Sequence, residues 1–410
     1  MTSDVLASSF TLPCGAVLPN RIAKAAMTEQ MATSTNAPTD AIVALYRCWG
    51  EGGSGMLLTG NVMIDRRALE HTRNVVLDDA RDAIIMNRWA DAAKAHGAHI
   101  WMQISHPGRQ CPKRVSKYPV SSSAIGVKGN GLDAIFARPR ALDATEIPKV
   151  IARYATTAAL AKDMGFTGVQ IHAAHGYLIS QFLTPLVNQR TDDWGGTPEK
   201  RMRFLLEIVR ATRAAVGPMF PISVKLNSAD FQRGGFSEDD SLNVVRALET
   251  EGVDLIEISG GNYENPAVMG MAESTRKREA YFIEYAHKMR AATKVPLMLT
   301  GGFRTAAAMR AAIVDGVIDI VGIARPLAVE PDLPKRMLSG AADSALPIEI
   351  RLGVKVLDDM MQSFWFNHQM RRIGEGKAPD PRRGKIPTLI RGVSEQVLFN
   401  PFSSREPVRY

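Results

Sequence analysis

The chain is poor in cysteine, with three in 410 residues: Cys14, Cys48 and Cys111. The number is odd and no CxxC pair occurs, which argues against a disulfide framework, a zinc ribbon and a cysteine-bound iron–sulfur cluster. We therefore expect a reducing, cytoplasmic setting.

Long apolar runs and targeting segments are also missing. No hydrophobic stretch approaches the roughly 18–20 residues of a membrane span. The first residues, MTSDVLASSFTLP, lack the basic start and apolar core of a secretory signal, and the last residues, REPVRY, match no lipidation or peroxisomal signal. We therefore expect no membrane partner.

Charge is not concentrated either. The formal net charge is +8, but the basic residues are dispersed, with only short clusters at Arg371-Arg372 and Arg382-Arg383. No RNA-binding motif or basic helix is present, so a solvated basic surface explains the charge better than a nucleic-acid interface does. A small anionic molecule fits the charge equally well as a partner.

What is present is an alternation of helical and apolar segments, the pattern of a parallel α/β fold. A helical stretch, a glycine and a short apolar run follow one another about eight times, and glycine is usual just past a helix end. Eight such units predict a closed (β/α)8 barrel, and the lack of an opening GxGxxG motif weighs against a dinucleotide-binding open sheet. The expected strands are residues 22–26, 56–59, 100–104, 169–171, 222–226, 255–258, 297–299 and 318–321.

Two regions interrupt this alternation. Residues 105–142 are rich in Ser, Gly, Pro and basic residues, which predicts a lid loop after the third strand, at the C-terminal face of the barrel. We predict a barrel over residues 1–345 and a C-terminal extension over 346–410, which packs on the barrel or on a partner subunit. The extension should contain an amphipathic helix over 348–370 and then an extended arm. The arm suggests a homodimer in which Arg409 or a neighbour reaches the other subunit.

The motif richest in reactive groups is HAAHGYLISQFLTP, which begins at His172. It follows a short apolar run, so two imidazoles and a phenol lie at the exit of an expected buried strand. His172 and His175 can donate hydrogen bonds to one oxygen, and Tyr177 can supply a proton nearby. These groups can polarise a carbonyl and protonate the adjacent carbon. The alternative is that they are ordinary polar loop residues.

Two glycine turns follow the seventh and eighth expected strands, LTGGFRT at 299–305 and VGIARP at 321–326. Barrels commonly bind phosphate there through backbone N–H groups and a helix N-terminus. Gly301, Gly302 and Gly322 would let the backbone approach an anion, and Arg325 would add a charged hydrogen bond. Ordinary turns are the alternative interpretation.

Other polar residues lie at the remaining strand ends. Lys225 ends the fifth strand and could stabilise negative charge, while Gln103 ends the third and can both donate and accept hydrogen bonds. Thr28 and Gly60 follow the first and second strands. Each could be a plain strand-end residue, but together they occupy the positions of barrel active sites.

These segments resemble the old yellow enzyme family of FMN-dependent ene-reductases and NADH:flavin oxidoreductases. The matching pieces are LPNRIAKAAMT (18–28), TGNVMI (59–64), MQISHPGRQ (102–110), residues 165–196, VKLN (224–227), LTGGFRT and VGIARP. The resemblance implies that FMN lies over the C-terminal mouth of the barrel. The flavin-binding residues that it implies are Ala26, Met27, Thr28, Gly60, Gln103 and Lys225 at the ring, and Gly301, Gly302, Gly322, Ala324 and Arg325 at the phosphate.

The resemblance also implies a ping-pong reaction. NADPH or NADH reduces the flavin and leaves, and a hydride then passes from the flavin to the β-carbon of an α,β-unsaturated carbonyl compound. His172 and His175 bind the carbonyl oxygen, and Tyr177, whose ordinary pKa of about 10 is not far from that of an enol, protonates the α-carbon. An NADH oxidase or flavin reductase with oxygen or another acceptor is the alternative.

One departure and two further alternatives bear on this reading. In one branch of the family a cysteine follows the first strand, whereas this chain has Thr28, so the flavin potential and substrate preference stay open. A metal-dependent hydrolase could use His172 and His175 with Asp230 or Glu257, but these residues complete no recognisable metal motif, and we expect no metal. A flavin-binding redox sensor is the other alternative.

Overall fold

The structure, a computed structural model, describes residues 4–129, 131–262, 264, 279–348, 350, 355–398 and 409–410. Parallel strands pair in the order β10-β11-β12-β13-β14-β3-β4-β7, and β7 also pairs with β10, which closes the sheet. The predicted (β/α)8 barrel is confirmed. Its strands are β3 (Ile22–Lys24), β4 (Met56–Leu58), β7 (His99–Ser105), β10 (Gly168–Ala173), β11 (Ile222–Asn227), β12 (Leu255–Ser259), β13 (Leu297–Thr300) and β14 (Ile320–Ile323).

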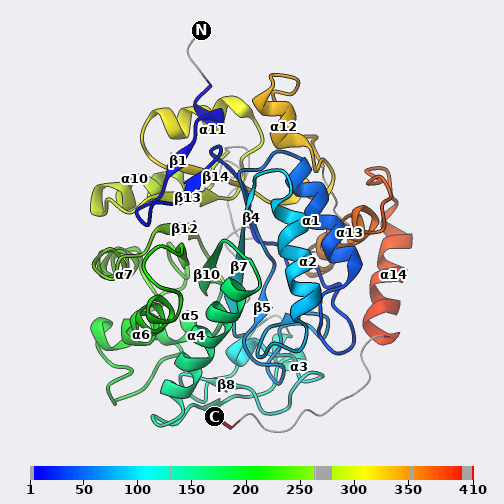
Figure 1. The fold of residues 1–410 in the computed structure, drawn as a ribbon. Helices are drawn as coiled ribbons and strands as arrows, with labels where there is room; N and C mark the ends of the chain where they lie inside the picture. Colours follow the sequence, from blue (N-terminus) through cyan, green and yellow to red (C-terminus); the bar gives the residue numbers. More distant parts are fainter. Residues whose placement is uncertain are drawn as a thin grey trace.

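Helices surround the barrel, as Figure 1 shows. Several of them begin at a Ser or Thr whose side chain accepts a hydrogen bond from a backbone N–H of the first turn, the usual N-terminal cap. The helices that follow barrel strands are α1 (Asp40–Glu51), α2 (Ala83–Lys94), α4 (Ile147–Asp163), α6 (Pro198–Val216), α7 (Glu238–Thr250), α10 (Ile283–Ala292) and α11 (Ala306–Val314). After β14 come η3 (Arg325–Ala328) and α12 (Leu333–Leu338).

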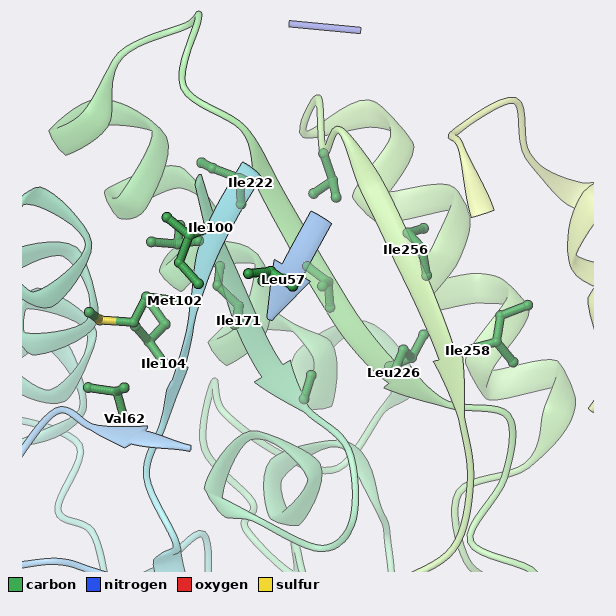
Figure 2. Close-up of a cluster of buried hydrophobic side chains, with 14 of the residues drawn as sticks. Leu57, Val62, Ile100, Met102, Ile104, Ile171, Ile222, Leu226, Ile256 and Ile258 are labelled. Carbon is green, nitrogen blue, oxygen red and sulfur yellow. The ribbon is translucent and has the colours of Figure 1, made fainter. Parts of the chain in front are cut away.

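The barrel strands are buried on both faces, and alternate side chains serve different layers. On β7, Ile100, Met102 and Ile104 belong to the large apolar core between strands and helices, part of which Figure 2 shows. Trp101 belongs to a separate cluster inside the barrel. Gln103 is buried on the same face of β7 as Trp101, so the barrel interior becomes polar toward the C-terminal ends of its strands.

The N-terminal end of the barrel is covered by a hairpin of β1 (Phe10–Thr11) and β2 (Val17–Leu18), preceded by η1 (Val5–Ala7). Leu12 and Leu18 join Trp101 and Met56 in the interior cluster. Apolar side chains therefore fill this end, and the polar side chains of the barrel lie toward the other end.

The segment expected as a lid has structure of its own. Residues 105–142 contain η2 (Gly108–Gln110), β8 (Val120–Ser121), α3 (Leu132–Ile135) and β9 (Arg140–Ala141), and β8 pairs with β9. Ser122 Oγ donates to the backbone oxygen of Gln181 at 2.8 Å. Two strands that the alternation did not predict, β5 (Val62–Met63) and β6 (Val75–Val76), extend the sheet beside β7, and they bring residues 64–74 to the mouth.

Two helices follow the barrel, α13 (Lys355–Gly374) and α14 (Lys385–Leu398). Figure 1 shows α13, in orange, beside α1, and α14, in red, outside α13. Over residues 385–398, where we expected part of an extended arm, the chain forms the helix α14 instead. Pro387 lies in the first turn of α14, where a missing N–H is tolerated, so it does not break the helix. A Cβ at Gly374 would lie 2.5 Å from the backbone oxygen of Ala41, so α13 and α1 are in close contact. Within the described ranges, no helix is both long and apolar enough to cross a bilayer.

The last described residues lie on the barrel of the same chain. The Tyr410 hydroxyl is 2.7 Å from His106 Nε2, and the guanidinium groups of Arg67 and Arg153 are each 5.4 Å from the Tyr410 ring centroid. The backbone oxygen of Arg409, expected near a partner subunit, accepts a hydrogen bond from Arg67 at 3.3 Å. The division at residue 345 and the homodimer stay predictions.

Closure of the barrel between β7 and β10 gives a first prediction. A Cβ at Gly168 would lie 2.6 Å from the indole ring of Trp101, its partner across the closing pair. We expect Gly168→Ala to lower the free energy of unfolding by about 1–3 kcal/mol through overpacking. The measurement is urea unfolding beside Gly126→Ala, where a new methyl group meets only ordinary contacts. Equal stability of the two variants would contradict this account of closure.

Candidate active site

The strands of the barrel are parallel, so their C-terminal ends meet at one mouth. Most of the residues singled out from the sequence occur at these ends, because they lie on a barrel strand or in the segment that follows one. They are Ala26, Met27 and Thr28 after β3, Gly60 after β4, Gln103 on β7, His172 on β10, Lys225 on β11, Gly301 and Gly302 after β13, Gly322 on β14, and Ala324 and Arg325 after it.

A row of buried polar side chains crosses four neighbouring strands inside the barrel. Lys225 Nζ donates to Glu257 Oε1 at 2.9 Å, and Gln170 Nε2 donates to Glu257 Oε2 at 2.8 Å. Gln103 Nε2 donates to Gln170 Oε1 at 2.6 Å. The register accounts for the row, since Gln103 lies opposite Gln170, and Lys225 opposite Glu257. The row therefore fixes the ammonium group of Lys225 and the amide group of Gln103, which the resemblance implies at the flavin ring.

The two histidine rings lie edge to face, with their centroids 5.1 Å apart. His172 Nδ1 accepts a hydrogen bond from the Ala174 N–H at 3.2 Å, so the ring hydrogen is on Nε2, which can donate. His175 Nε2 lies 2.6 Å from Ser259 Oγ. Burial, with electrostatic repulsion from His175 when that ring is protonated and from Lys225, holds the pKa of His172 well below its usual value. Burial with Lys225 lowers the pKa of His175 to about 3. Both rings are neutral near pH 7.

The backbone of His175 is in the left-handed region, with φ of 61°. This conformation is uncommon for a residue with a side chain and is kept only where surrounding contacts require it. The His175 N–H donates to Asn227 Oδ1 at 3.2 Å, and its carbonyl accepts from Gln110 Nε2 at 3.0 Å. Gly176 follows with φ of 76°. The turn that presents the second imidazole is therefore held from two sides.

Tyr177 lies against His172, with ring centroids 4.9 Å apart, just before α5 (Leu178–Leu183). Its hydroxyl donates to Glu70 Oε2. Glu70 also accepts from Thr28 Oγ1 at 2.6 Å and from Asn61 Nδ2 at 2.6 Å. Glu70, which the sequence analysis did not single out, thus connects Tyr177, the expected proton donor, to Thr28, which is expected at the flavin ring.

Gly60 lies against the segment expected to line the flavin ring. A Cβ at Gly60 would be 2.5 Å from the Met27 backbone oxygen and 2.7 Å from Thr28 Cα, so only glycine fits. The Gly60 N–H donates to Glu29 Oε1 at 2.9 Å, and the Tyr46 hydroxyl donates to the same carboxylate. Glu29 and Tyr46 were also missed from the sequence. The local sequence gives no signal for them, because Glu29 lies between the polar residues Thr28 and Gln30, and Tyr46 belongs to the buried face of α1.

The glycines expected to bind phosphate lie on, or just after, the paired strands β13 and β14. Gly301 and Gly302 have φ of 129° and 90°, conformations that favour glycine, and Thr300 lies opposite Gly322. Thr300 Oγ1 is buried and has no hydrogen-bond partner among the residues that the structure describes, which leaves a polar group for a ligand. Arg325 is exposed, and its Nη1 donates to Gln362 Oε1 of α13 at 2.8 Å. The turns and the donors of the barrel interior fit FMN, while the Arg325 guanidinium contacts the C-terminal extension.

The carboxylates considered as metal ligands have other partners. Glu257 binds Lys225 and Gln170, and Asp230 Oδ2 accepts from the Phe236 N–H at 3.2 Å. Among the residues that the structure describes, no three His, Cys, Asp or Glu side chains gather as a set that could hold a metal ion.

Comparison with known proteins gives consistent matches. A model of the NADH:flavin oxidoreductase / NADH oxidase family matches residues 14–344. The chain is 39% identical over 356 residues to the NADH-dependent flavin oxidoreductase iliE of Hypocrea jecorina (strain QM6a), covering 80% of this chain and 88% of that protein. It is 38% identical over 352 residues to iliE of Neonectria sp. (strain DH2), covering 80% of this chain but only 46% of that longer protein. The solved structure of an old yellow enzyme homologue from Zymomonas mobilis matches with a TM-score of 0.70 and 25% identity, over 84% of this chain and 95% of that one.

The buried pair of Lys225 and Glu257 predicts how substitutions change the free energy of unfolding. We expect Glu257→Leu to lower the free energy of unfolding by about 3–5 kcal/mol, because it leaves the Lys225 ammonium buried without its carboxylate. The double variant Lys225→Met, Glu257→Leu should recover most of that loss, since both charges are gone. Urea unfolding of the three proteins measures this. A single variant as stable as the parent would show that the pair does not compensate a buried charge.

The lowered histidine pKa values predict a pH dependence. The pKa of His175 is about 3 when folded and near 6.5 in an unfolded chain, so the unfolded chain binds more protons between these values. The free energy of unfolding should therefore fall as the pH drops from 6.5 toward 3, and His175→Gln should reduce that fall. Ring ¹⁵N shifts of labelled protein should report neutral His172 and His175 at pH 5. Titration of either ring near pH 6 would contradict the burial account.

Proposed function

The chain belongs to the NADH:flavin oxidoreductase / NADH oxidase family, and on that premise we propose that it is an FMN-dependent ene-reductase. Membership makes it an NAD(P)H-dependent flavin oxidoreductase. The proposed reaction is reduction of the activated C=C bond of an α,β-unsaturated carbonyl compound. The observation that supports this reaction is the cluster of His172, His175 and Tyr177 rings at the barrel mouth.

The proposed cofactor is FMN, which when bound supplies the two-electron redox step between NAD(P)H and the alkene. Lys225 and Gln103 would meet its pyrimidine, and the segment around Gly60 would line its ring. The full proposed set is Ala26, Met27, Thr28, Gly60, Gln103 and Lys225 at the ring, and Gly301, Gly302, Gly322, Ala324 and Arg325 at the phosphate.

The histidines act on the carbonyl oxygen. His172 has its ring hydrogen on Nε2, and both rings stay neutral, so they donate hydrogen bonds without carrying a full charge. Preorganised donors aimed at an oxygen that becomes negative are typically worth about 3–4 kcal/mol of transition-state stabilisation each. The same contacts withdraw electron density from the β-carbon and orient the alkene.

Tyr177 supplies the proton to the α-carbon. Its ring packs against His172, so a carbonyl bound by the histidine places the neighbouring carbon near the phenol. The cytoplasmic location and the homodimer stay predictions.

An anaerobic two-step titration tests the reaction. Purified holoprotein is reduced with NADH or NADPH and then mixed with 2-cyclohexenone, while flavin absorption is followed. We expect the oxidised spectrum to return rapidly. Reduction without reoxidation by the enone would instead favour an oxidase or flavin reductase whose acceptor is oxygen or another compound.

The role of Tyr177 is tested by Tyr177→Phe. Loss of the proton donor should slow reoxidation by 2-cyclohexenone by about 10²–10⁴-fold, while flavin reduction by NAD(P)H changes little. Stopped-flow measurement of each half-reaction separates the two effects. Equal slowing of both half-reactions would contradict the assignment.

A further inference from the structure

A small cavity lies between the barrel and the two C-terminal helices, with a volume of about 30 Å³. On the barrel side its lining includes His71 and Arg73, from the loop between β5 and β6. On the other side it is lined by residues of α13 and α14. The polar ones include Asn367, His368 and Arg371 on α13 and Arg391 on α14.

Three of these side chains carry buried nitrogen atoms without a hydrogen-bond partner. His71 Nδ1 accepts a hydrogen bond from the Arg73 N–H at 3.2 Å, so the hydrogen of the neutral ring is on Nε2. Within the described ranges, His71 Nε2 has no partner, and the same is true of Asn367 Nδ2 and of both ring nitrogens of His368. Only 8% of His368 is exposed. Buried polar groups nearly always have a partner, so several unsatisfied N–H donors around one cavity indicate a bound acceptor.

The charges around the cavity favour a negative acceptor. Burial and nearby arginine charges, those of Arg73 and Arg371 among them, lower the pKa of His71 to about 3. Burial and further arginine charges, including those of Arg391 and Arg371, lower the pKa of His368 to about 4. Both rings are therefore neutral near pH 7, and each donates one hydrogen bond at a place where the arginines create a positive potential.

We propose that this cavity is a binding site for one small monovalent anion, of the size of chloride or bromide. The donors to it are His71 Nε2, Asn367 Nδ2 and a ring nitrogen of His368. A cavity needs about 10–15 Å³ to hold one water molecule, so this one admits a small ion but not a nucleotide. Water could satisfy the same donors, but an anion also gains from the arginine charges.

The site connects segments that are far apart in the sequence. His71 follows Glu70, which accepts hydrogen bonds from Thr28 and Tyr177. An anion held by His71 and His368 therefore ties α13 to the loop that carries Glu70. A ligand that binds only the folded chain stabilises it, so the anion should raise the stability of the protein. The inference does not depend on the proposed reaction, because none of the proposed flavin-binding or catalytic residues belongs to this site.

The first test is a crystal structure of the holoprotein grown in sodium bromide, with data collected at the bromine absorption edge. We expect an anomalous peak within hydrogen-bond distance of His71 Nε2, Asn367 Nδ2 and the His368 ring. A water molecule without anomalous signal at this place, or another part of the chain filling the cavity, would overturn the proposal.

The second test is thermal unfolding of the holoprotein in increasing sodium bromide, with sodium fluoride added to keep the ionic strength constant. Fluoride holds its hydration shell more tightly and serves as the weakly bound reference. We expect Tm to rise by about 2 °C or more and then to saturate. His368→Leu should lose this rise, whereas His96→Leu, which removes an exposed histidine near Glu51, should keep it. Asn367→Leu gives the same comparison if His368→Leu does not fold.

The remaining outcomes are also decisive. An equal rise in His368→Leu and His96→Leu would place the bromide effect elsewhere on the protein and overturn the site. A rise that does not saturate would be a general effect of salt and would overturn it as well. A bromide peak in the crystal without a saturable effect in solution would limit binding to crystal concentrations. Each of these outcomes leaves the ene-reductase proposal unchanged, because alkene reduction is measured separately.

Discussion

Glu257 is a carboxylate with no exposed surface inside the barrel, and the active site depends on how its charge is compensated. An ionised group in such a position is strongly unfavourable unless it is paired and hydrogen-bonded. Lys225 and Gln170 supply those partners, and Gln103 is held in turn by Gln170. The compensation therefore sets the positions of the two side chains that meet the proposed flavin pyrimidine, and it ties the register of four strands to the chemistry at the mouth.

Lys225 links the proposed flavin-binding residues to the two histidines proposed to bind the carbonyl. Its charge is one of the causes that lower the pKa values of His172 and His175, after burial itself. The cation that pairs with Glu257 thus helps to keep both imidazoles neutral. Neutral rings donate hydrogen bonds to a carbonyl oxygen while its charge develops, so the two halves of the site depend on one ammonium group.

The proposed proton transfer by Tyr177 depends on a different part of the fold. Residues 64–74 reach the mouth because β5 and β6 extend the sheet beside β7. That loop carries Glu70, which joins Tyr177 to Thr28. One carboxylate therefore accepts hydrogen bonds from both Tyr177 and Thr28, which is proposed to lie at the flavin ring. A substitution at either residue would change the hydrogen bonding of the other.

The sequence by itself determined the barrel, because each strand and its preceding helix have a local apolar pattern and a glycine boundary. All of the expected strands coincide with barrel strands to within two residues at either end. It also determined which side chains reach the mouth, since parallel strands end together. It did not reveal the helix α14, because a proline in the first turn of a helix and a proline in an extended arm have the same local appearance.

Only the tertiary structure decided which polar groups meet. Tyr177 and Glu70 are 107 residues apart, Gln103 and Gln170 are 67 apart, and Arg325 contacts Gln362 rather than a residue of its own turn. Such pairings follow from strand register and from the packing of loops and terminal helices on the barrel. A hydrogen bond between distant segments has no periodicity and no local propensity, so its partners are fixed only when the whole chain is folded.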